Sequence, residues 1–196
     1  MNPRVDIICM DALTSLSSMA DESVHCVVTS PPYYGLRDYK VEGQIGLEKT
    51  LDEYIVRVVA VFDHVWRVLR KDGTLWLNMG DAYANDGKWG GKTGGKQSYL
   101  DDSNRKRIGR EKRVTGLKSK DLIGQPCILA GCPPDGVVLD PFGGSGTVGL
   151  AAARLGRNAI LIDLNPDYAR MAARRIKDDA PLITEVNLDI HEWKTA

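Results

Sequence analysis

One short loop in the sequence combines a hydroxyl group, two prolines and an aromatic ring, as Ser30-Pro31-Pro32-Tyr33. The prolines remove two backbone N–H donors and fix two φ angles, so the loop is rigid and rich in hydrogen-bond acceptors. Such a loop suits a substrate that donates hydrogen bonds, for example an exocyclic amino group. If the Ser30 hydroxyl and the Pro31 carbonyl accept its two N–H bonds, a tetrahedral nitrogen with an available lone pair is favoured, and Tyr33 could stack on the base. The alternative is a proline turn that only ends a strand.

A glycine turn lies further along the chain, where Asp140 is followed by Pro-Phe and then by Gly143, Gly144 and Gly146. Glycine allows positive φ and leaves no side chain between the backbone and a ligand. Asp163 ends the next apolar run, 23 residues after Asp140, and an acidic side chain there can hydrogen-bond ribose hydroxyls. The combination predicts a nucleoside-cofactor site, with a plain tight turn as the alternative. It is not a Walker loop, because no Gly-Lys-Ser/Thr follows.

The carboxylate of Asp140 bears on which cofactor this turn would bind. A negative charge at the mouth of the turn repels a pyrophosphate and suits a cofactor with an ammonium or sulfonium group. S-adenosylmethionine carries both of these charges and no phosphate. The electrostatics therefore favour a methyltransferase over a dehydrogenase.

The elements that must position these loops alternate between strands and helices. Short apolar runs predict strands, and apolar residues at helical spacing predict helices. This alternation predicts an α/β fold with a largely parallel sheet. The predicted strands are residues 5–9, 25–29, 74–78, 136–140, 159–163 and 182–186, and the predicted helices are residues 51–70, 145–155 and 166–177.

The longest predicted helix, residues 51–70, has clear signals at both ends. Thr50 and Glu53 form a capping-box pattern at its start, and Gly73 lies just past its end. Trp66 in this helix and Trp76 in the following strand are expected to pack in the core.

Charge is strongly segregated along the 196 residues. The formal net charge is zero, yet residues 88–120 hold 11 Lys/Arg and only 3 Asp/Glu, which leaves the rest of the chain at −8. This glycine-rich basic stretch predicts a flexible surface insert at about residues 85–120 of a single domain spanning residues 1–196. It is either a solvated linker or an arm that binds the phosphates of DNA. The predicted DNA-binding residues are Lys88, Lys92, Lys96, Arg105, Lys106, Arg107, Arg110, Lys112 and Arg113.

Composition excludes several other classes of protein. No apolar run approaches the ~18 residues of a membrane span, and the N-terminus lacks the pattern of a signal peptide. The four cysteines show no Cys-x-x-Cys spacing and there are only three histidines, so we expect reduced thiols and no metal site. These features predict a soluble cytosolic protein.

With these two loops, the sequence resembles the DNA amino-methyltransferases, which modify N4 of cytosine or N6 of adenine. Residues 29–33 match their catalytic tetrapeptide and residues 140–147 match their cofactor loop. The catalytic loop comes first, which resembles the permuted "beta" arrangement of these enzymes. The resemblance covers most of residues 4–86 and 118–178, and it implies a Rossmann-like S-adenosylmethionine-dependent methyltransferase fold in a bacterial or phage-infected cell. It also implies a restriction-modification setting and a target base that is flipped out of the duplex.

The resemblance also implies roles for individual residues. The catalytic loop would be Ser30, Pro31, Pro32 and Tyr33, and a serine at its first position slightly favours cytosine N4 over adenine N6. Asp11 sits where the family contacts the adenine of the cofactor, with helix N-capping as the alternative. The remaining cofactor residues would be Asp140, Phe142, Gly144, Gly146 and Thr147 for the methionine and ribose portions, Asp163 for the ribose hydroxyls and Asn165, also a helix cap, for the adenine edge.

Residues just beyond the catalytic loop are candidates for the pocket of the target base. Tyr34, Arg37, Asp38 and Tyr39 could line it, and roles in a surface turn are about as plausible for them.

The chain departs from the family in its length. Only about 60 residues separate Asn78 from Val137, where relatives usually carry further sheet strands and a target-recognition region. The sheet is therefore expected to be incomplete at one edge, which a second copy or a separate specificity partner could cover. Two alternatives to a minimal methyltransferase remain open. One is a degenerate subunit that binds cofactor or DNA without turnover, and the other is methylation of a protein glutamine or an RNA base.

Overall fold

Six strands form a single sheet in the order β3-β2-β4-β5-β1-β6, and every pairing between neighbours is parallel. The computed structural model describes residues 2–79, 121–179 and 184–190. The predicted α/β architecture with a parallel sheet is confirmed. The strands are β1 (Arg4–Cys9), β2 (Val24–Thr29), β3 (Leu69–Leu77), β4 (Val137–Asp140), β5 (Asn158–Asp163) and β6 (Glu185–Ile190).

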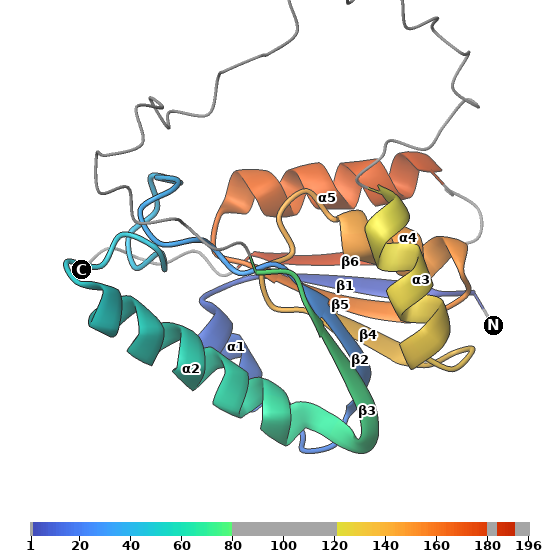
Figure 1. Ribbon diagram of the computed structural model, residues 1–196. Helices are drawn as coiled ribbons and strands as arrows, with labels where there is room; N and C mark the ends of the chain where they lie inside the picture. The colour runs from blue at the N-terminus through green and yellow to red at the C-terminus, as the bar shows by residue number, and fades with distance from the viewer. Residues whose placement is uncertain (1, 80–120, 180–183, 191–196) are drawn as a thin grey trace, which may run out of the picture. The chain divides into compact units, whose positions relative to one another are not determined.

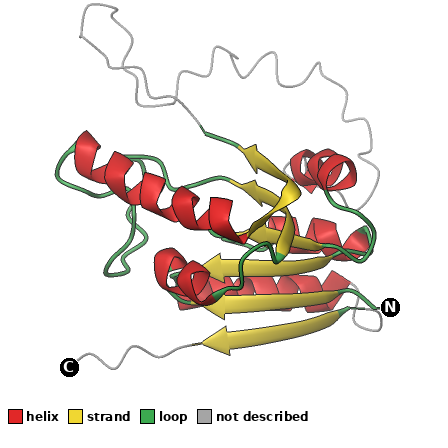
Figure 2. Ribbon diagram, turned by 90° about the horizontal axis from the view of Figure 1, so that it is seen from below, coloured by secondary structure: helices red, strands yellow, loops and turns green. Residues whose placement is uncertain are grey.

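Helices cover both faces of the sheet, as Figure 1 shows. On one face lie α1 (Ala12–Ser18) and α2 (Leu51–Val68), and on the other lie α3 (Asp121–Gly131), α4 (Thr147–Arg154) and α5 (Pro166–Asp179). The same three layers are visible from below in Figure 2. A parallel sheet covered on both faces needs apolar residues on both sides of its strands, which explains why these strands read as apolar runs.

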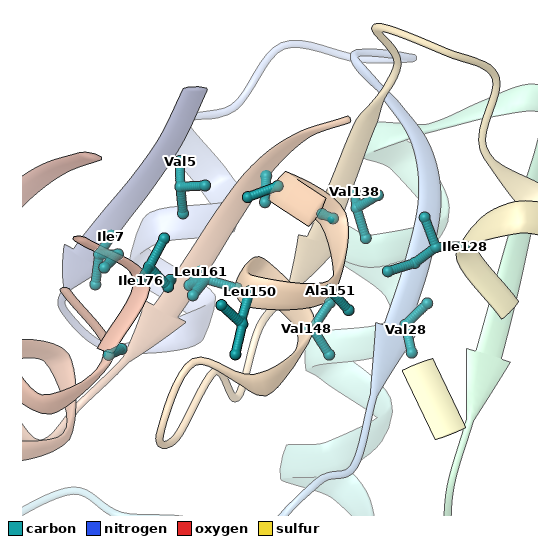
Figure 3. Close-up of a cluster of buried hydrophobic side chains, with 14 of the residues drawn as sticks. Val5, Ile7, Val28, Ile128, Val138, Val148, Leu150, Ala151, Leu161 and Ile176 are labelled. Carbon is teal, nitrogen blue, oxygen red and sulfur yellow. The ribbon is translucent and has the colours of Figure 1, made fainter. Parts of the chain in front are cut away.

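The two sides of the sheet hold separate hydrophobic clusters. Side chains alternate along each strand, so that Leu161 of β5 points to one cluster and its neighbour Ile162 points to the other. Figure 3 shows the first cluster, in which strand residues pack against α3, α4 and α5. Its labelled members are Val5, Ile7, Val28, Ile128, Val138, Val148, Leu150, Ala151, Leu161 and Ile176.

Helix α2 begins as predicted and ends earlier than predicted. The capping box is present, because the Thr50 hydroxyl accepts from the Glu53 amide while the Glu53 carboxylate accepts from the Thr50 amide. The helix stops at Val68, because Leu69 takes an extended conformation, is buried and pairs with Val24 of β2. Gly73 therefore does not follow a helix end.

Strand β3 contains an irregularity that holds Gly73. Leu69 pairs with Val24 and Thr74 pairs with Cys26, so β3 carries extra residues between these two pairs. The backbone doubles back closely there, because a Cβ at Gly73 would lie 2.7 Å from the Leu69 side chain. This close approach, and not helix capping, explains why position 73 is a glycine.

Both tryptophans that were expected in the core are exposed. The buried stripe of α2 consists of Tyr54, Val58, Val61, Val65 and Val68, and Trp66 lies off this stripe with 81% of its surface accessible. Trp76 is 40% exposed, because β3 is an edge strand among the described residues.

Two further elements differ from their predicted bounds. The last strand is β6, Glu185–Ile190, and not residues 182–186, because its pairing with β1 begins at Glu185. Residues 121–131 form one helix, α3, with Pro126 inside it.

The order of the strands creates a crevice between β2 and β4. From β2 the chain passes through α2 to β3 on one side, whereas from β4 it passes through α4 to β5 on the other. Loops that leave neighbouring strands in opposite directions open a crevice at the carboxyl ends of those strands, which is where α/β sheets bind ligands. The loop after Thr29 and the turn after Asp140 both start at this point.

The chain divides into a unit of Met1–Met79 with Lys118–Ala196 and a second unit of Gly80–Leu117. The second unit, with the basic insert predicted at about residues 85–120, lies outside the described residues, so the insert and the single domain stay predictions. No helix among residues 2–79, 121–179 and 184–190 is long and apolar enough to cross a membrane.

Candidate functional site

The glycine turn between β4 and α4 is built for close approach of its backbone to a neighbour. Gly144 and Gly146 both have positive φ, at 50° and 78°, and Gly146 is the N-cap of α4. A Cβ at Gly146 would lie 2.7 Å from the Ala172 Cβ of α5, whereas a Cβ at Gly144 would meet only the Phe142 carbonyl at 3.9 Å. Gly146 therefore lets two helices pack closely, and Gly144 leaves open space.

Asp163 ties the end of β5 to this turn. One of its carboxylate oxygens accepts from the Gly144 amide at 2.7 Å and the other accepts from the Asn165 amide at 2.8 Å. Burial raises the pKa of Asp163, and these two backbone hydrogen bonds act in the opposite direction. The carboxylate thus fixes the turn, and each oxygen retains a lone pair for a ligand.

Asp140 lies beneath the turn and is only 5% exposed. Its Oδ1 accepts from the Thr29 hydroxyl at 2.8 Å and from the Phe142 amide at 3.1 Å. Burial raises its pKa to about 7, the two hydrogen bonds lower it, and the nearby charge of Asp163 raises it further. The Thr29 bond joins the strand before the proline loop to the strand before the glycine turn.

The proline loop after β2 is held from two sides. The hydroxyl of Tyr54, a buried residue of α2, donates to the Pro32 carbonyl at 2.9 Å. The Tyr33 hydroxyl lies 3.3 Å from the Ser30 hydroxyl oxygen and donates to the Asn78 carbonyl at 3.5 Å. Ser30 is exposed and Pro31 is buried, so the loop presents the Ser30 hydroxyl while Pro31 packs against the rest of the protein.

A pocket of about 230 Å³ brings these loops together. It is lined by the start of α1, the proline loop, residues 37–45, the glycine turn, and the end of β5 with the start of α5. The lining residues are Asp11, Ala12, Ser30, Pro32, Arg37, Tyr39, Val41, Gly43, Gln44, Ile45, Pro141, Phe142, Gly144, Ser145, Asp163, Leu164, Asn165 and Tyr168.

Of the twelve residues predicted for catalysis and cofactor binding, seven line this pocket and five do not. Ser30 and Pro32 line it with Asp11, Phe142, Gly144, Asp163 and Asn165. Pro31 and Asp140 are buried beside it, and the Tyr33 hydroxyl faces Ser30 and Asn78. Gly146 packs on α5, and the Thr147 hydroxyl accepts from Arg175 at 3.0 Å. The predicted DNA-binding residues, Lys88 to Arg113, lie outside the described residues.

Two predicted cofactor residues also act as helix caps. The Asp11 carboxylate accepts from the amide and the hydroxyl of Thr14, at 3.0 and 3.1 Å, and so caps α1. The Asn165 side-chain carbonyl accepts from the Asp167 amide at 2.9 Å at the start of α5. The capping alternative is therefore confirmed for both residues. Each residue also lines the pocket, and their contacts with a cofactor stay predictions.

Residues 35–49 form a further wall of the pocket, which we call the pocket loop. Arg37 and Tyr39 were candidates and line the pocket, while Tyr34 packs on Tyr54 with ring centroids 5.5 Å apart and Asp38 accepts from the Lys40 amide. Gln44 of this loop and Tyr168 of α5 also line the pocket, and they could not be predicted because neither forms a motif with its neighbours in sequence. Among the described residues, no group of three or more His, Cys, Asp or Glu could hold a metal ion.

Comparison with known proteins gives a consistent set of matches. The family model N6_N4_Mtase, described as DNA methylase, matches residues 24–123 and 104–174. The Type II methyltransferase M.XycI of Xanthomonas campestris pv. cyanopsidis is 31% identical over 262 aligned positions, which cover 85% of this chain and 86% of the relative. M.SmaI of Serratia marcescens is also 31% identical, covering 87% of this chain and 90% of the relative.

Two solved structures share the fold. TTHA0409 of Thermus thermophilus, a DNA modification methylase by its description, was solved in complex with S-adenosyl-L-methionine. It is 24% identical with a TM-score of 0.63, covering 94% of this chain and 99% of its own. The cytosine-N4-specific PvuII DNA methyltransferase is 18% identical with a TM-score of 0.56, and 95% of each chain is covered. At these identities the two structures speak for the fold alone, and they confirm the predicted methyltransferase fold class.

Proposed function

Since the chain belongs to the family of DNA methylases that modify N4 or N6 amino groups, we propose that it methylates an exocyclic amino group in DNA with S-adenosylmethionine as donor. The observation that carries this proposal is the shared pocket. Ser30 and Pro32 of the proline loop line the same cavity as Gly144 of the glycine turn and Asp163 at the end of β5. A methyl donor in one half would therefore lie beside a base in the other.

The pocket fits a cationic nucleoside cofactor. Gly144 leaves open space where a side chain would intrude, and Asp163 retains lone pairs for ribose hydroxyls. Asp11 and Asp163 line the pocket and Asp140 lies just beneath it, so the carboxyl groups give the pocket an acidic character that suits a cofactor with sulfonium and ammonium charges. Asn165 and Leu164 would contact the adenine. When bound, the cofactor supplies a methyl carbon that is activated by the adjacent positive sulfur.

The proline loop would orient the amino group of the target base. The Ser30 hydroxyl and the Pro31 carbonyl are the proposed acceptors for its two N–H bonds, because the Pro32 carbonyl already accepts from Tyr54. These bonds favour a tetrahedral nitrogen and aim its lone pair toward the methyl carbon. Positioning of this kind contributes about 7–11 kcal/mol in well-oriented reactions. Tyr33 would stack on the flipped base.

We favour cytosine N4 over adenine N6 as the target, because Ser30 occupies the first position of the loop. Sequence specificity is expected to be relaxed. The alignment with M.XycI spans 262 positions against 196 residues in this chain, so the relative contains residues that this chain lacks. Phosphate contacts would come from the basic residues between Lys88 and Arg113, in the cytoplasm of a bacterial or phage-infected cell.

The test is transfer of tritium from labelled S-adenosylmethionine to duplex and single-stranded DNA. We expect transfer by the wild type and its loss in Ser30→Ala and Asp140→Ala. Ser23→Ala is the matched control, since the Ser23 hydroxyl bonds only within its own turn, to the Ala20 carbonyl at 2.7 Å. Absence of transfer to any DNA would contradict the proposal. Digestion to nucleosides and mass spectrometry then identifies the modified base.

The short chain supports a second candidate, a subunit that binds cofactor or DNA without turnover. Calorimetry that shows cofactor binding in a protein without transfer would favour this candidate, and robust transfer would exclude it.

Strand β3 forms an exposed edge of the sheet, where Leu75, Trp76 and Leu77 are 40–44% exposed among the described residues. A second copy or a specificity partner would cover this edge, and the molar mass in solution with and without DNA distinguishes the two.

A further inference from the structure

The pocket loop is attached to α2 by one arginine. The Arg57 guanidinium donates to the carbonyls of Gly43 at 2.6 Å and Gln44 at 2.9 Å, and to the Glu48 carboxylate at 2.9 Å. The Glu48 side chain is only 5% exposed, and its other oxygen accepts from the Gly46 amide at 2.8 Å. Three groups of the loop thus depend on a single side chain.

The Gln44 side chain connects the segment held by Arg57 to the first part of the pocket loop. Its side-chain carbonyl accepts from the Tyr39 amide at 2.7 Å, and its side-chain NH₂ donates to the Arg37 carbonyl at 3.0 Å. At the opposite side of the pocket, the Asn165 side chain donates to the Tyr39 carbonyl at 3.3 Å, and the Tyr39 ring meets Tyr168 edge-on at 6.0 Å. The loop therefore extends from α2 to α5 along the wall of the pocket.

We infer that Arg57 is a positioning residue for cofactor binding, which it supports by holding the pocket loop against Asn165 and Tyr168. This inference rests on the proposed function, because it takes the pocket to be the cofactor site. Arg57 does not itself line the pocket, whereas Gly43 and Gln44, whose carbonyls it binds, both do. Without the guanidinium, the two carbonyls lose this donor and the buried Glu48 carboxylate keeps only the Gly46 amide. The loop then gains conformations in which the wall of the pocket is incomplete.

Arg67 of the same helix provides a matched control. It also donates to two backbone carbonyls, of Leu16 at 2.6 Å and Met19 at 2.8 Å, and it also pairs with a carboxylate, that of Asp21. The two arginine side chains are similarly exposed, at 34% for Arg57 and 31% for Arg67. The partners of Arg67 lie at the far end of α1 and its turn, and none of them lines the pocket.

The experiment compares Arg57→Met with Arg67→Met in the full chain. Two quantities are measured: the Kd of S-adenosylmethionine by calorimetry and the melting temperature without cofactor. Both variants are expected to melt lower than the wild type. Arg57→Met is expected to raise Kd about tenfold or more, because loss of charge-assisted hydrogen bonds of this kind is worth more than a tenfold factor. Arg67→Met should leave Kd within about twofold, and Arg57→Lys, which keeps the charge but not the fork, should fall between.

The outcomes separate this inference from the proposed function. If the wild type binds no S-adenosylmethionine, the proposed function fails and this inference fails with it. If the wild type binds and Arg57→Met raises Kd no more than Arg67→Met, only the role of Arg57 is wrong. If Arg57→Met does not fold, Arg57→Lys and Glu48→Gln carry the comparison, and an unchanged Kd in both overturns the inference.

Discussion

The buried environment of Asp140 is expected to couple cofactor binding to pH. Its ordinary pKa of 3.8 is raised to about 7 by burial. A bound cation would favour the ionised form, so binding must release a proton wherever the free protein holds one. We expect affinity for S-adenosylmethionine to weaken as pH falls below about 7, by up to about tenfold per unit.

Asp140→Asn is the sharpest test of this coupling. The two hydrogen bonds of Asp140 both end on Oδ1, which asparagine retains, so the variant removes the charge and keeps the contacts. Its cofactor Kd should be higher than that of the wild type at pH 8, and the pH dependence due to Asp140 should vanish. Titration of the cofactor itself and of Asp163 is common to both proteins. Equal pH profiles would contradict the coupling.

Asp140→Asn should weaken cofactor binding and yet make the folded protein more stable at pH 8. Between pH 3.8 and about 7, folded Asp140 holds a proton that the unfolded chain has released, so stability falls as pH rises through this interval. At pH 8 the buried charge is fully present, and Asp140→Asn should raise the free energy of unfolding by a few kcal/mol, on the order of 1.4 kcal/mol per pKa unit. At pH 4 the gain should be small. Denaturant unfolding at both pH values measures this, and a loss of stability at pH 8 would refute it.

Thr29 should set where this titration occurs. Its hydroxyl donates to Asp140 and lowers the pKa of that carboxyl. Thr29→Val keeps the shape of the side chain and removes the donor, so the midpoint of the pH dependence of binding should move upward. Thr29→Ser should restore it, and a midpoint unchanged in Thr29→Val would show that this hydrogen bond has no influence.

Residue types and spacing indicated which side chains gather at the site but not how deep each one lies. Asp140 was placed at the mouth of the turn, and it is buried beneath it because Thr29 and the Phe142 amide satisfy it there. Such a position depends on a residue 111 positions away in the chain. No local pattern shows that dependence.

At the level of elements, Gly144 and Gly146 of the glycine turn have different structural roles. Gly146→Ala brings a methyl group 2.7 Å from Ala172 at positive φ, and should cost about 2–5 kcal/mol of stability. Gly144→Ala has room, and should cost only about 1–2 kcal/mol for its positive φ while filling the pocket. We therefore expect calorimetry to show weaker cofactor binding by Gly144→Ala, with a smaller loss of melting temperature than in Gly146→Ala. Equal destabilisation by the two substitutions would contradict this division.

Most elements could be predicted because strand and helix periodicities are local. The exceptions come from contacts between distant segments. Helix α2 stops at Val68 since Leu69 joins β2, and the buried stripe includes Val61 and Val68 in place of Trp66. In the pocket loop the sequence indicated Arg37 and Tyr39 but not Gln44, because the shape of the loop depends on Arg57, which lies on the next helix.

At the scale of the whole molecule, the segregated charge predicts how DNA binding responds to salt. Each phosphate contact that is lost should reduce the slope of log K against log salt by about one. Replacing Lys106 and Arg107 by Gln should thus lower the slope by about two. The charge-matched control is Arg174 and Lys177, exposed residues of α5, whose replacement should leave the slope unchanged. If both double substitutions change the slope equally, the proposal that the basic segment contacts DNA phosphates is wrong.

The pairing of the first strand has a consequence for synthesis of the chain. The strands that flank β1 are β5 and β6, and Val5 pairs with Ala159 and Val186. While the protein is being translated, the apolar residues Val5 and Ile7 therefore have no sheet partner until more than 150 residues have followed them. Contacts of such long range slow folding and leave nascent chains prone to aggregation. Yield in cells should consequently depend more on growth temperature and chaperone supply than the stability of the finished fold would suggest.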